Sequence, residues 1–261
     1  MKVQKIGQVF VKATQFLHPS SVMVDKNGIE HDRSFALVEE NNAFVGSQEH
    51  SEFIPLRFNL MPSDDKLELV LPTGDSVIER IQLSSQSFTI NHAGIKQIEV
   101  VEVSGAWKRA LSDYAKRPIR LVKCLSVGRA IDVCPVTFMT TGSLKRLEKE
   151  VGATVDPDRM RAGFVIENSK EHEEDEWNNK KLKLGEALLR VRSGVPRCGV
   201  IGLNPSDGTK DQNLMNALIR YREKVRLPGG LIPDYATPGF ATYAEVLEPG
   251  RVAVGDTAEI S

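Results

Sequence analysis

A cysteine among arginines is the most chemically suggestive feature of the sequence. Residues 190–199 contain three arginines and place Arg197 directly before Cys198. Nearby guanidinium charge favours the thiolate, the form of cysteine that attacks electrophiles and binds soft metals. The alternative is a buried cysteine that packs as a small hydrophobic residue, and composition alone favours this alternative. Cys124 and Cys134 stand in apolar, strand-like contexts that suit it better.

Other motifs that carry catalysis are missing from the sequence. It contains no P-loop, no nucleophile elbow, no HExxH and no GxGxxG that opens a helix. Six of the ten residues in 167–176 are acidic, and Trp177 follows them. This segment either binds a metal or forms a solvated loop, and we favour the loop because runs of charge are usually solvated.

Composition and charge exclude several classes of protein. The chain has 261 residues, 41% of them hydrophobic, with 34 Lys and Arg against 35 Asp and Glu. These proportions are typical of a globular protein and argue against a disordered or fibrous chain. Because no positive charge is in excess, nucleic acid is not an expected partner. Anionic small molecules remain possible ligands, since a local cluster of cations is enough to bind them.

The cysteine count and the apolar runs suggest a cellular setting. Three cysteines without a CxxC pair argue against a disulfide framework. The N-terminus has no apolar signal region, and no run approaches the roughly 18 apolar residues of a membrane helix. We expect a soluble protein of the cytoplasm without a membrane partner.

Short β-type runs separated by turn residues dominate the first hundred residues. We predict strands over residues 3–11, 35–38, 58–61, 67–71, 76–83 and 98–103. Ser104 can cap a helix that runs to about residue 114, and Pro118 then forces a restart as a strand over 119–124. We therefore predict two units, a β-barrel-like unit over residues 1–110 and a second unit over residues 111–261.

The second half mixes helices with strands. Apolar residues at helical spacing predict helices over 144–151, stopped by Gly152, and over 214–225. The predicted strands are 163–167, 181–192 with a turn at Gly185, 199–203, 240–247 and 252–260. The predicted class is mostly β with some α, an α+β fold with a mostly antiparallel second sheet.

An ordered set of short motifs resembles one family. The runs GIEHDRSFALV at 28–38 and FVGSQE at 44–49 are similar to the β-barrel domain that precedes a MOSC domain. The runs DRMRAGFVI at 158–166, EDEW at 174–177, LG at 184–185, PRC at 196–198 and EPGRVAVGD at 248–256 resemble the MOSC domain itself. The resemblance covers essentially the whole chain in the right order, and it implies a β-barrel-like second unit against which the first one packs.

The resemblance implies that the chain binds the molybdenum cofactor, a molybdopterin. By motif position the protein ligand of the metal is Cys198, and a thiolate suits sulfur-coordinated molybdenum. Lys12, Arg33 and Arg161 match the family's cofactor-contacting positions, and Arg197 is a further candidate for the pterin phosphate. Without the resemblance, these cations would be interpreted as solvated charges or loop ion pairs.

Two positions depart from the family pattern. Ala13 stands where relatives typically have a serine, and Gly163 stands where they have an asparagine. A hydroxyl and an amide donor to the pterin are therefore missing. Backbone N–H groups are candidates to replace them, because glycine permits a close approach.

The resemblance further implies a molybdenum oxidoreductase that removes oxygen from N-hydroxylated small molecules, as amidoxime-reducing components and their bacterial relatives do. The chain shows no ferredoxin-like extension and no four-cysteine cluster, so we expect a separate ferredoxin- or cytochrome-like electron donor. Asp207, within the turn sequence NPSDG, is a candidate for orienting substrate or assisting proton delivery. The same sequence is also a good turn and nothing more.

A non-catalytic role is the alternative. The chain would then store or deliver molybdenum cofactor or sulfur, with Cys198 as the carrying thiol. MOSC domains also occur fused to desulfurases that use pyridoxal phosphate, and this chain has no desulfurase half, so pyridoxal phosphate would come with a partner. A β-rich interaction domain that has lost its cofactor is a third interpretation.

Overall fold

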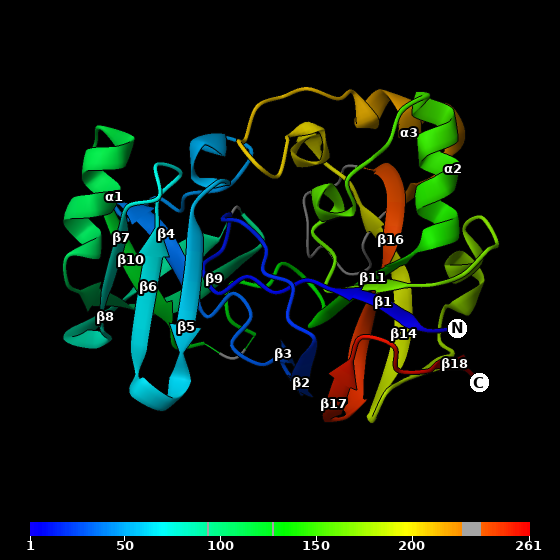
Figure 1. The fold of residues 1–261 in the computed structure, drawn as a ribbon, viewed down its shortest axis with the longest axis horizontal. Helices are drawn as coiled ribbons and strands as arrows, with labels where there is room; N and C mark the ends of the chain where they lie inside the picture. The colour runs from blue at the N-terminus through cyan, green and yellow to red at the C-terminus, as the bar shows by residue number, and fades with distance from the viewer. Residues whose placement is uncertain (93, 127, 226–235) are drawn as a thin grey trace.

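Strands dominate the structure, a computed structural model that describes residues 1–92, 94–126, 128–225 and 236–261. Two lobes lie side by side, with helix α1 on the outside of one and helices α2 and α3 on the other (Figure 1). Both termini lie in the second lobe. The predicted class, mostly β with some α, is confirmed.

A nearly closed sheet forms the second lobe. Among the described strands it has eight members, ordered β1-β12-β11-β16-β14-β13-β18, with β15 paired to β16. Their bounds are β1 (Val3–Ile6), β11 (Val136–Thr140), β12 (Phe164–Ile166), β13 (Lys181–Leu184), β14 (Ala187–Pro196), β15 (Lys224–Val225), β16 (Thr237–Glu248) and β18 (Ala258–Ile260). An isolated bridge between Lys2 and Thr257 links the two edges, so the sheet curves into the expected barrel-like shape. Most pairs are antiparallel as predicted, while β11 and β12 are parallel.

Apolar side chains fill the barrel and also cover part of its outside. Phe138 and Trp177 stack inside it with their ring centroids 6.0 Å apart. Outside, α2 (Thr141–Val151) and α3 (Leu214–Tyr221) contribute Leu147 and Leu218 to an apolar cluster that also contains Tyr243 of β16. Burial of one apolar stripe on each helix is what its apolar periodicity predicts. Helix α2 ends at Gly152 in the left-handed conformation with φ +74°, as expected from the sequence.

Two smaller sheets and α1 form the first lobe. One sheet has the order β4-β10-β9-β8 and the other β5-β6-β7. The bounds are β4 (Phe35–Glu39), β5 (Arg57–Met61), β6 (Lys66–Val70), β7 (Ser76–Arg80), β8 (Gln82–His92), β9 (Lys96–Ser104), α1 (Trp107–Ala115) and β10 (Ile119–Cys124). Phe53, Phe58 and Trp107 pack in the core of this lobe.

Backbone pairing ties distant parts of the chain together. Strand β1 pairs with β12, and β2 (Ser21–Asp25) pairs with both β3 (Gly28–Ile29) and β17 (Gly250–Ala253). Strand β10, which follows α1 in the sequence, completes the sheet of the first lobe. The division into units 1–110 and 111–261 stays a prediction.

Several predicted elements differ from the observed ones. Residues 199–203 were expected as a strand, but Gly199–Gly202 form the 3-10 helix η5, because a short apolar run carries no periodicity that distinguishes the two. The helix predicted over 214–225 stops at Tyr221, and Val225 lies in β15. Helix α1 begins at Trp107 without a side-chain cap from Ser104. The remaining 3-10 helices are η1 (Ser51–Phe53), η2 (Pro62–Asp64), η3 (Pro157–Met160) and η4 (Glu173–Trp177).

Candidate functional site

The chain brings Lys12 and Arg33 together through two segments that run side by side. Val11 bridges Phe35 in parallel, the Lys12 N–H donates to the Phe35 carbonyl at 2.9 Å, and the Arg33 N–H donates to the Val9 carbonyl at 2.6 Å. Hydrogen bonds therefore fix the backbone from which the Lys12 and Arg33 side chains extend. These bonds explain why two residues far apart in the sequence reach one site.

Arg161 joins this site from the end of η3. Its Nη2 donates to the Thr14 carbonyl at 3.0 Å, and Arg33 Nη2 donates to the Arg161 carbonyl at 3.2 Å. Both guanidinium groups lie over the Phe16 ring, at 4.9 Å from its centroid for Arg161 and 5.5 Å for Arg33. An aromatic face attracts cations, so Phe16 helps to hold two like charges close together. Burial and the Arg33 charge lower the pKa of Arg161 to about 10.

Arg197 is the most buried cation of the group, at 8% exposure. It follows the last residue of β14, and its Nη2 donates to the Met160 carbonyl at 2.7 Å, one residue before Arg161. Its Nε is buried without a hydrogen-bond partner among the described residues. Burial lowers the pKa of Arg197, while the adjacent Cys198 opposes this.

Neither Arg161 nor Arg197 lies within ion-pair distance of a carboxylate of the described residues. A buried charge without a partner is destabilising, and proteins retain one mainly where a ligand of opposite charge completes it. The arrangement is therefore suited to bind an anion.

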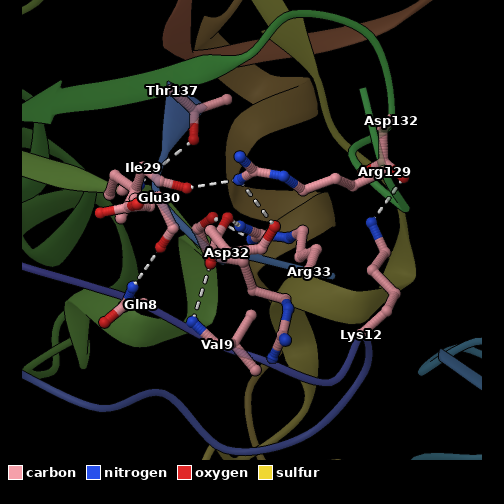
Figure 2. Close-up of polar contacts among 12 residues, drawn as sticks. Gln8, Val9, Lys12, Ile29, Glu30, Asp32, Arg33, Arg129, Asp132 and Thr137 are labelled. Atoms are coloured by element: carbon pink, nitrogen blue, oxygen red, sulfur yellow. Dashed lines mark hydrogen bonds and ion pairs between the residues drawn. The ribbon is translucent and has the colours of Figure 1, made fainter. Parts of the chain in front are cut away.

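Lys12 differs from the arginines because it has an internal partner. Its Nζ donates to Asp132 Oδ1 at 2.6 Å, and His92 Nε2 lies 3.3 Å from the same oxygen (Figure 2 shows the Lys12 contact). Burial lowers the pKa of Lys12, and Arg33 lowers it further against the opposing charge of Asp132. Burial would raise the pKa of Asp132, but Lys12 and His92 overcome it and hold the pKa well below its ordinary value.

A buried carboxylate supports the Arg33 side of the site. Asp32, at 3% exposure, forms an ion pair with Arg33 and accepts the Val9 N–H at 2.8 Å (Figure 2). Arg129 donates to the Ile29 carbonyl at 2.6 Å, next to this segment. Arg33 is thus oriented by its sequence neighbour, in agreement with the HDR motif that singled it out.

Unusual backbone conformations gather around the site. Ala13, His31, Arg33, Arg129 and Arg161 all have positive φ, between 49° and 73°. For residues with a Cβ atom this region is disfavoured by about 1 kcal/mol or more per residue, and such strain often marks functional sites. The strain is retained because the surrounding hydrogen bonds fix these segments.

Cys198 is exposed, unlike the buried cysteine that composition alone favoured. It precedes η5, and a Cβ atom placed on the next residue, Gly199, would meet no other atom within 4 Å, so the backbone after the cysteine also borders open space. Cys124 and Cys134 are half-buried, and burial raises their thiol pKa values to about 12 and about 11. Of the three cysteines, Cys198 is therefore the one most accessible to a ligand.

Asp207 is engaged by its own turn. Its Oδ1 accepts the backbone N–H of Thr209 at 2.8 Å and the Thr209 hydroxyl at 2.7 Å. These bonds lower the pKa of Asp207, so the carboxyl is ionised near neutral pH and has no proton to donate. The geometry agrees with the turn interpretation of this sequence.

The two departures from the family pattern are both buried in backbone packing. Ala13 is fully buried. The Gly163 N–H donates to the Thr137 carbonyl at 2.9 Å, and the Gly163 carbonyl accepts the Gly7 N–H at 2.9 Å. The Gly163 N–H is therefore not free to replace the missing amide donor.

The acidic segment is only partly a solvated loop. Glu174 is 1% exposed and accepts from the Ser143 hydroxyl at 2.6 Å and the Thr140 hydroxyl at 2.9 Å, at the start of α2. Burial raises the pKa of Glu174. Within the described parts of the chain, no three His, Cys, Asp or Glu side chains converge as a metal would require.

Sequence reasoning missed Asp132, His92 and Phe16. Asp132 is a single acid in an apolar stretch, with no spacing that marks it. His92 stands in no motif, yet it ends β8 and is fully buried against Phe44, with ring centroids 4.6 Å apart. Pairing of β8 with β9 would have been the only signal for its burial, and the sequence did not predict that hairpin in full.

Comparison with known proteins identifies the family. The MOSC domain model matches residues 129–259, half of the chain, so the chain belongs to the MOSC domain family. It is 21% identical over 246 residues to a protein named molybdenum cofactor sulfurase 2 from Aedes aegypti, covering 90% of this chain and 31% of that protein. It is 27% identical over 126 residues to mitochondrial amidoxime reducing component 2 from Homo sapiens, covering 48% of this chain and 36% of that protein.

This chain spans about a third of the length of the sulfurases that it matches over most of its own length. Among solved structures it is similar to the YuaD protein from Bacillus subtilis, with a TM-score of 0.45 and 10% identity, over 99% of this chain and 94% of the other. Among the described residues, no helix is long and apolar enough to cross a bilayer.

Proposed function

We propose that this MOSC protein binds a molybdenum cofactor through Cys198 and reduces N-hydroxylated small molecules. The observation that carries the proposal is the group of cations beside an exposed thiol, in which Arg161 and Arg197 have no carboxylate partner. The similarity to an amidoxime reducing component supports the type of reaction.

The residues present suit such a cofactor. A sulfur-coordinated metal takes a thiolate, and Cys198 is an exposed residue that offers a thiol. A pterin phosphate needs charge-assisted donors, which Arg33, Arg161 and Arg197 provide. The buried, unpartnered Nε of Arg197 is a donor that a phosphate oxygen would satisfy.

Each side chain has a defined task in this proposal. Arg161 and Arg197 bind the phosphate, and Arg33, held by Asp32, completes the group. Lys12 adds positive charge while Asp132 keeps its ammonium in place. The bound cofactor supplies the two-electron chemistry that removes the hydroxyl oxygen, with two protons, as water. Asp207 receives no task because Thr209 already occupies its carboxylate.

The electrons must come from another molecule in this proposal. We propose a separate ferredoxin- or cytochrome-like protein as the donor. A chemical reductant can replace it in the test below.

A carrier function is the second candidate, because the chain is similar to several proteins named molybdenum cofactor sulfurase. In this case the exposed Cys198 would carry sulfur or hold the cofactor for transfer to another protein. The Gly163 N–H, already used by Thr137, leaves fewer donors for firm cofactor binding and favours transfer.

One experiment separates these functions. The protein is purified from a host that makes the cofactor, its molybdenum is measured by mass spectrometry, and benzamidoxime reduction is followed with reduced methyl viologen. We expect close to one molybdenum per chain and turnover in the wild type, and loss of both in Cys198→Ala. The matched control is Cys134→Ala, which removes a half-buried thiol and should retain both.

Other results would change the assignment. A wild type that binds molybdenum without turnover supports the carrier. Equal absence of molybdenum from the wild type and Cys198→Ala contradicts the whole site assignment.

A further inference from the structure

A cleft of about 340 Å³ opens beside the cation group. Phe16, whose ring contacts Arg33 and Arg161, forms part of its wall, and η3 forms another part. Helix η3 packs against η5, the helix that directly follows Cys198. The cleft therefore adjoins the candidate site, and its volume is in the range of small-molecule sites.

The acidic groups of the cleft are almost fully engaged. Asp158 Oδ1 accepts from Lys5 Nζ at 2.8 Å, and Asp158 Oδ2 lies 2.8 Å from His18 Nε2. Asp156 Oδ1 accepts the backbone N–H of Asp158 at 2.9 Å. Lys5 and His18 thus both pair with Asp158, whereas Asp156 has no cationic partner among the described residues.

Three polar side chains of the cleft, those of Arg57, Gln15 and Ser206, have no partner among the described residues. The Arg57 guanidinium lines the cleft and is exposed, and no side chain in the described ranges hydrogen-bonds or ion-pairs with it. The Gln15 amide and the Ser206 hydroxyl also line the cleft and have no partner within the described chain. Because the guanidinium presents parallel N–H groups, it matches a planar carboxylate in a bidentate contact.

The charge balance selects a monoanion. A phosphate dianion at Arg57 would meet one guanidinium and would share the cleft with Asp156, which has no cationic partner among the described residues. A single carboxylate matches the single unpaired guanidinium and experiences less repulsion. Phe16, Leu17 and Pro205 add apolar surface to the lining for the body of such a molecule.

We infer that this cleft binds the carboxylate of a small organic acid, with Arg57 as the principal anchor. This substrate role rests on the proposed function: the cleft selects N-hydroxylated substrates that carry a carboxylate on an apolar body. Arg57 acts as a specificity-determining residue, separate from the cations that hold the cofactor.

The first test measures binding to the protein without cofactor. The probes are 4-methylbenzoate and its neutral analogue 4-methylbenzamide, titrated into wild type, Arg57→Gln and Arg80→Gln. Arg80 is the matched control because it is an exposed arginine at the end of β7, outside the cleft. We expect the carboxylate to bind at least tenfold more tightly than the amide in wild type and Arg80→Gln, and Arg57→Gln to abolish the preference.

Equal affinity for the two probes in the wild type overturns the inference. An equal loss in Arg57→Gln and Arg80→Gln also overturns it, because it shows that only the net charge matters. Neither result depends on molybdenum or on turnover.

The second test compares KM for 4-carboxybenzamidoxime and benzamidoxime with the cofactor-loaded protein. We expect the carboxylated substrate to have a KM at least fivefold lower in wild type and Arg80→Gln, and the two KM values to converge in Arg57→Gln. Turnover with equal KM values in the wild type overturns the substrate role of the cleft. A third outcome separates the two proposals. If the binding test shows the carboxylate preference but neither substrate is turned over, the anion-binding cleft stands and the proposed reductase function is overturned.

Discussion

The two ends of the cation group differ in how their charge is compensated. At one end, Lys12 contacts Asp132 at 2.6 Å, with His92 beside the same carboxylate. At the other end, Arg161 and Arg197 donate only to main-chain carbonyls of the described chain. Both ends are positively charged, but only the first contains its own counter-ion.

From this difference we predict that the lysine end stabilises the folded protein and that the arginine end binds an anionic ligand. A charge with an internal partner contributes to stability, whereas a buried charge without one opposes it until a ligand binds. We therefore expect substitutions at the arginine end to weaken anion binding without loss of stability. Substitutions at the lysine end should mainly lower stability.

The largest effect is expected for Arg161→Gln. Gln keeps a side chain at the same backbone position and removes the charge, so affinity for inorganic pyrophosphate should fall about 10- to 100-fold, since a charge-assisted hydrogen bond contributes about 1.5–3 kcal/mol. The free energy of unfolding without ligand should stay within about 0.5 kcal/mol of the wild type or rise. Calorimetric titration and urea unfolding measure the two quantities.

Arg192→Gln is the control, because the Arg192 guanidinium pairs with Glu245 and Asn179 and not with a residue of this group. It should leave pyrophosphate affinity unchanged. If Arg161→Gln lowered the free energy of unfolding by more than about 1 kcal/mol, the arginine end would be structural and the comparison would be wrong.

Asp132→Asn should produce the opposite pattern. It removes the counter-ion of Lys12, whose side chain is 13% exposed, while Asp132 itself is 48% exposed and screened by water. We therefore expect the free energy of unfolding at pH 7 to fall by about 1 kcal/mol. Pyrophosphate affinity should rise severalfold, because Lys12 becomes available to the ligand. Unchanged stability would show that solvent alone compensates Lys12.

The sequence predicted the cations of this site but not which of them have a carboxylate counter-ion. Arg33 and Arg161 lie in recognisable motifs, and Cys198 is marked by its arginine neighbours. The partner Asp132 carries no local signal, because its role depends on a contact with a residue 120 positions away in the sequence. His92 is buried only because β8 pairs with β9, a hairpin whose full length the alternation did not predict.

The fold was predicted to a similar degree. Strands with clear alternation, such as β6 and β9, were found within two residues at each end. Strand β11 was missed because it is almost entirely buried and lacks alternation. The helix η5 was predicted as a strand, since its form depends on close packing of Gly202 against the Gln212 carbonyl.

The pH dependence of stability tests the lysine end through His92, which lies beside Asp132. Burial lowers the pKa of His92, although Asp132 opposes this. The unfolded chain therefore binds a proton at His92 more readily, and the stability that the neutral imidazole contributes is lost as pH falls below about 6.5. The wild type should be more stable than His92→Gln at pH 8, and the difference in free energy of unfolding should shrink between pH 6.5 and 5. A constant difference would contradict a neutral, buried His92.

The smallest expected effect compares one aromatic ring at each end. Phe16→Leu removes the ring beneath Arg33 and Arg161, and Phe44→Leu removes the ring beside His92. Phe16 is buried and Phe44 half-buried, and each exchange should lower the free energy of unfolding by about 1 kcal/mol. Only Phe16→Leu also removes the ring over which Arg33 and Arg161 lie, so it alone should weaken pyrophosphate binding, by about two- to fourfold. Equal weakening by both exchanges, measured by calorimetric titration, would mean that the two ends act as one binding surface.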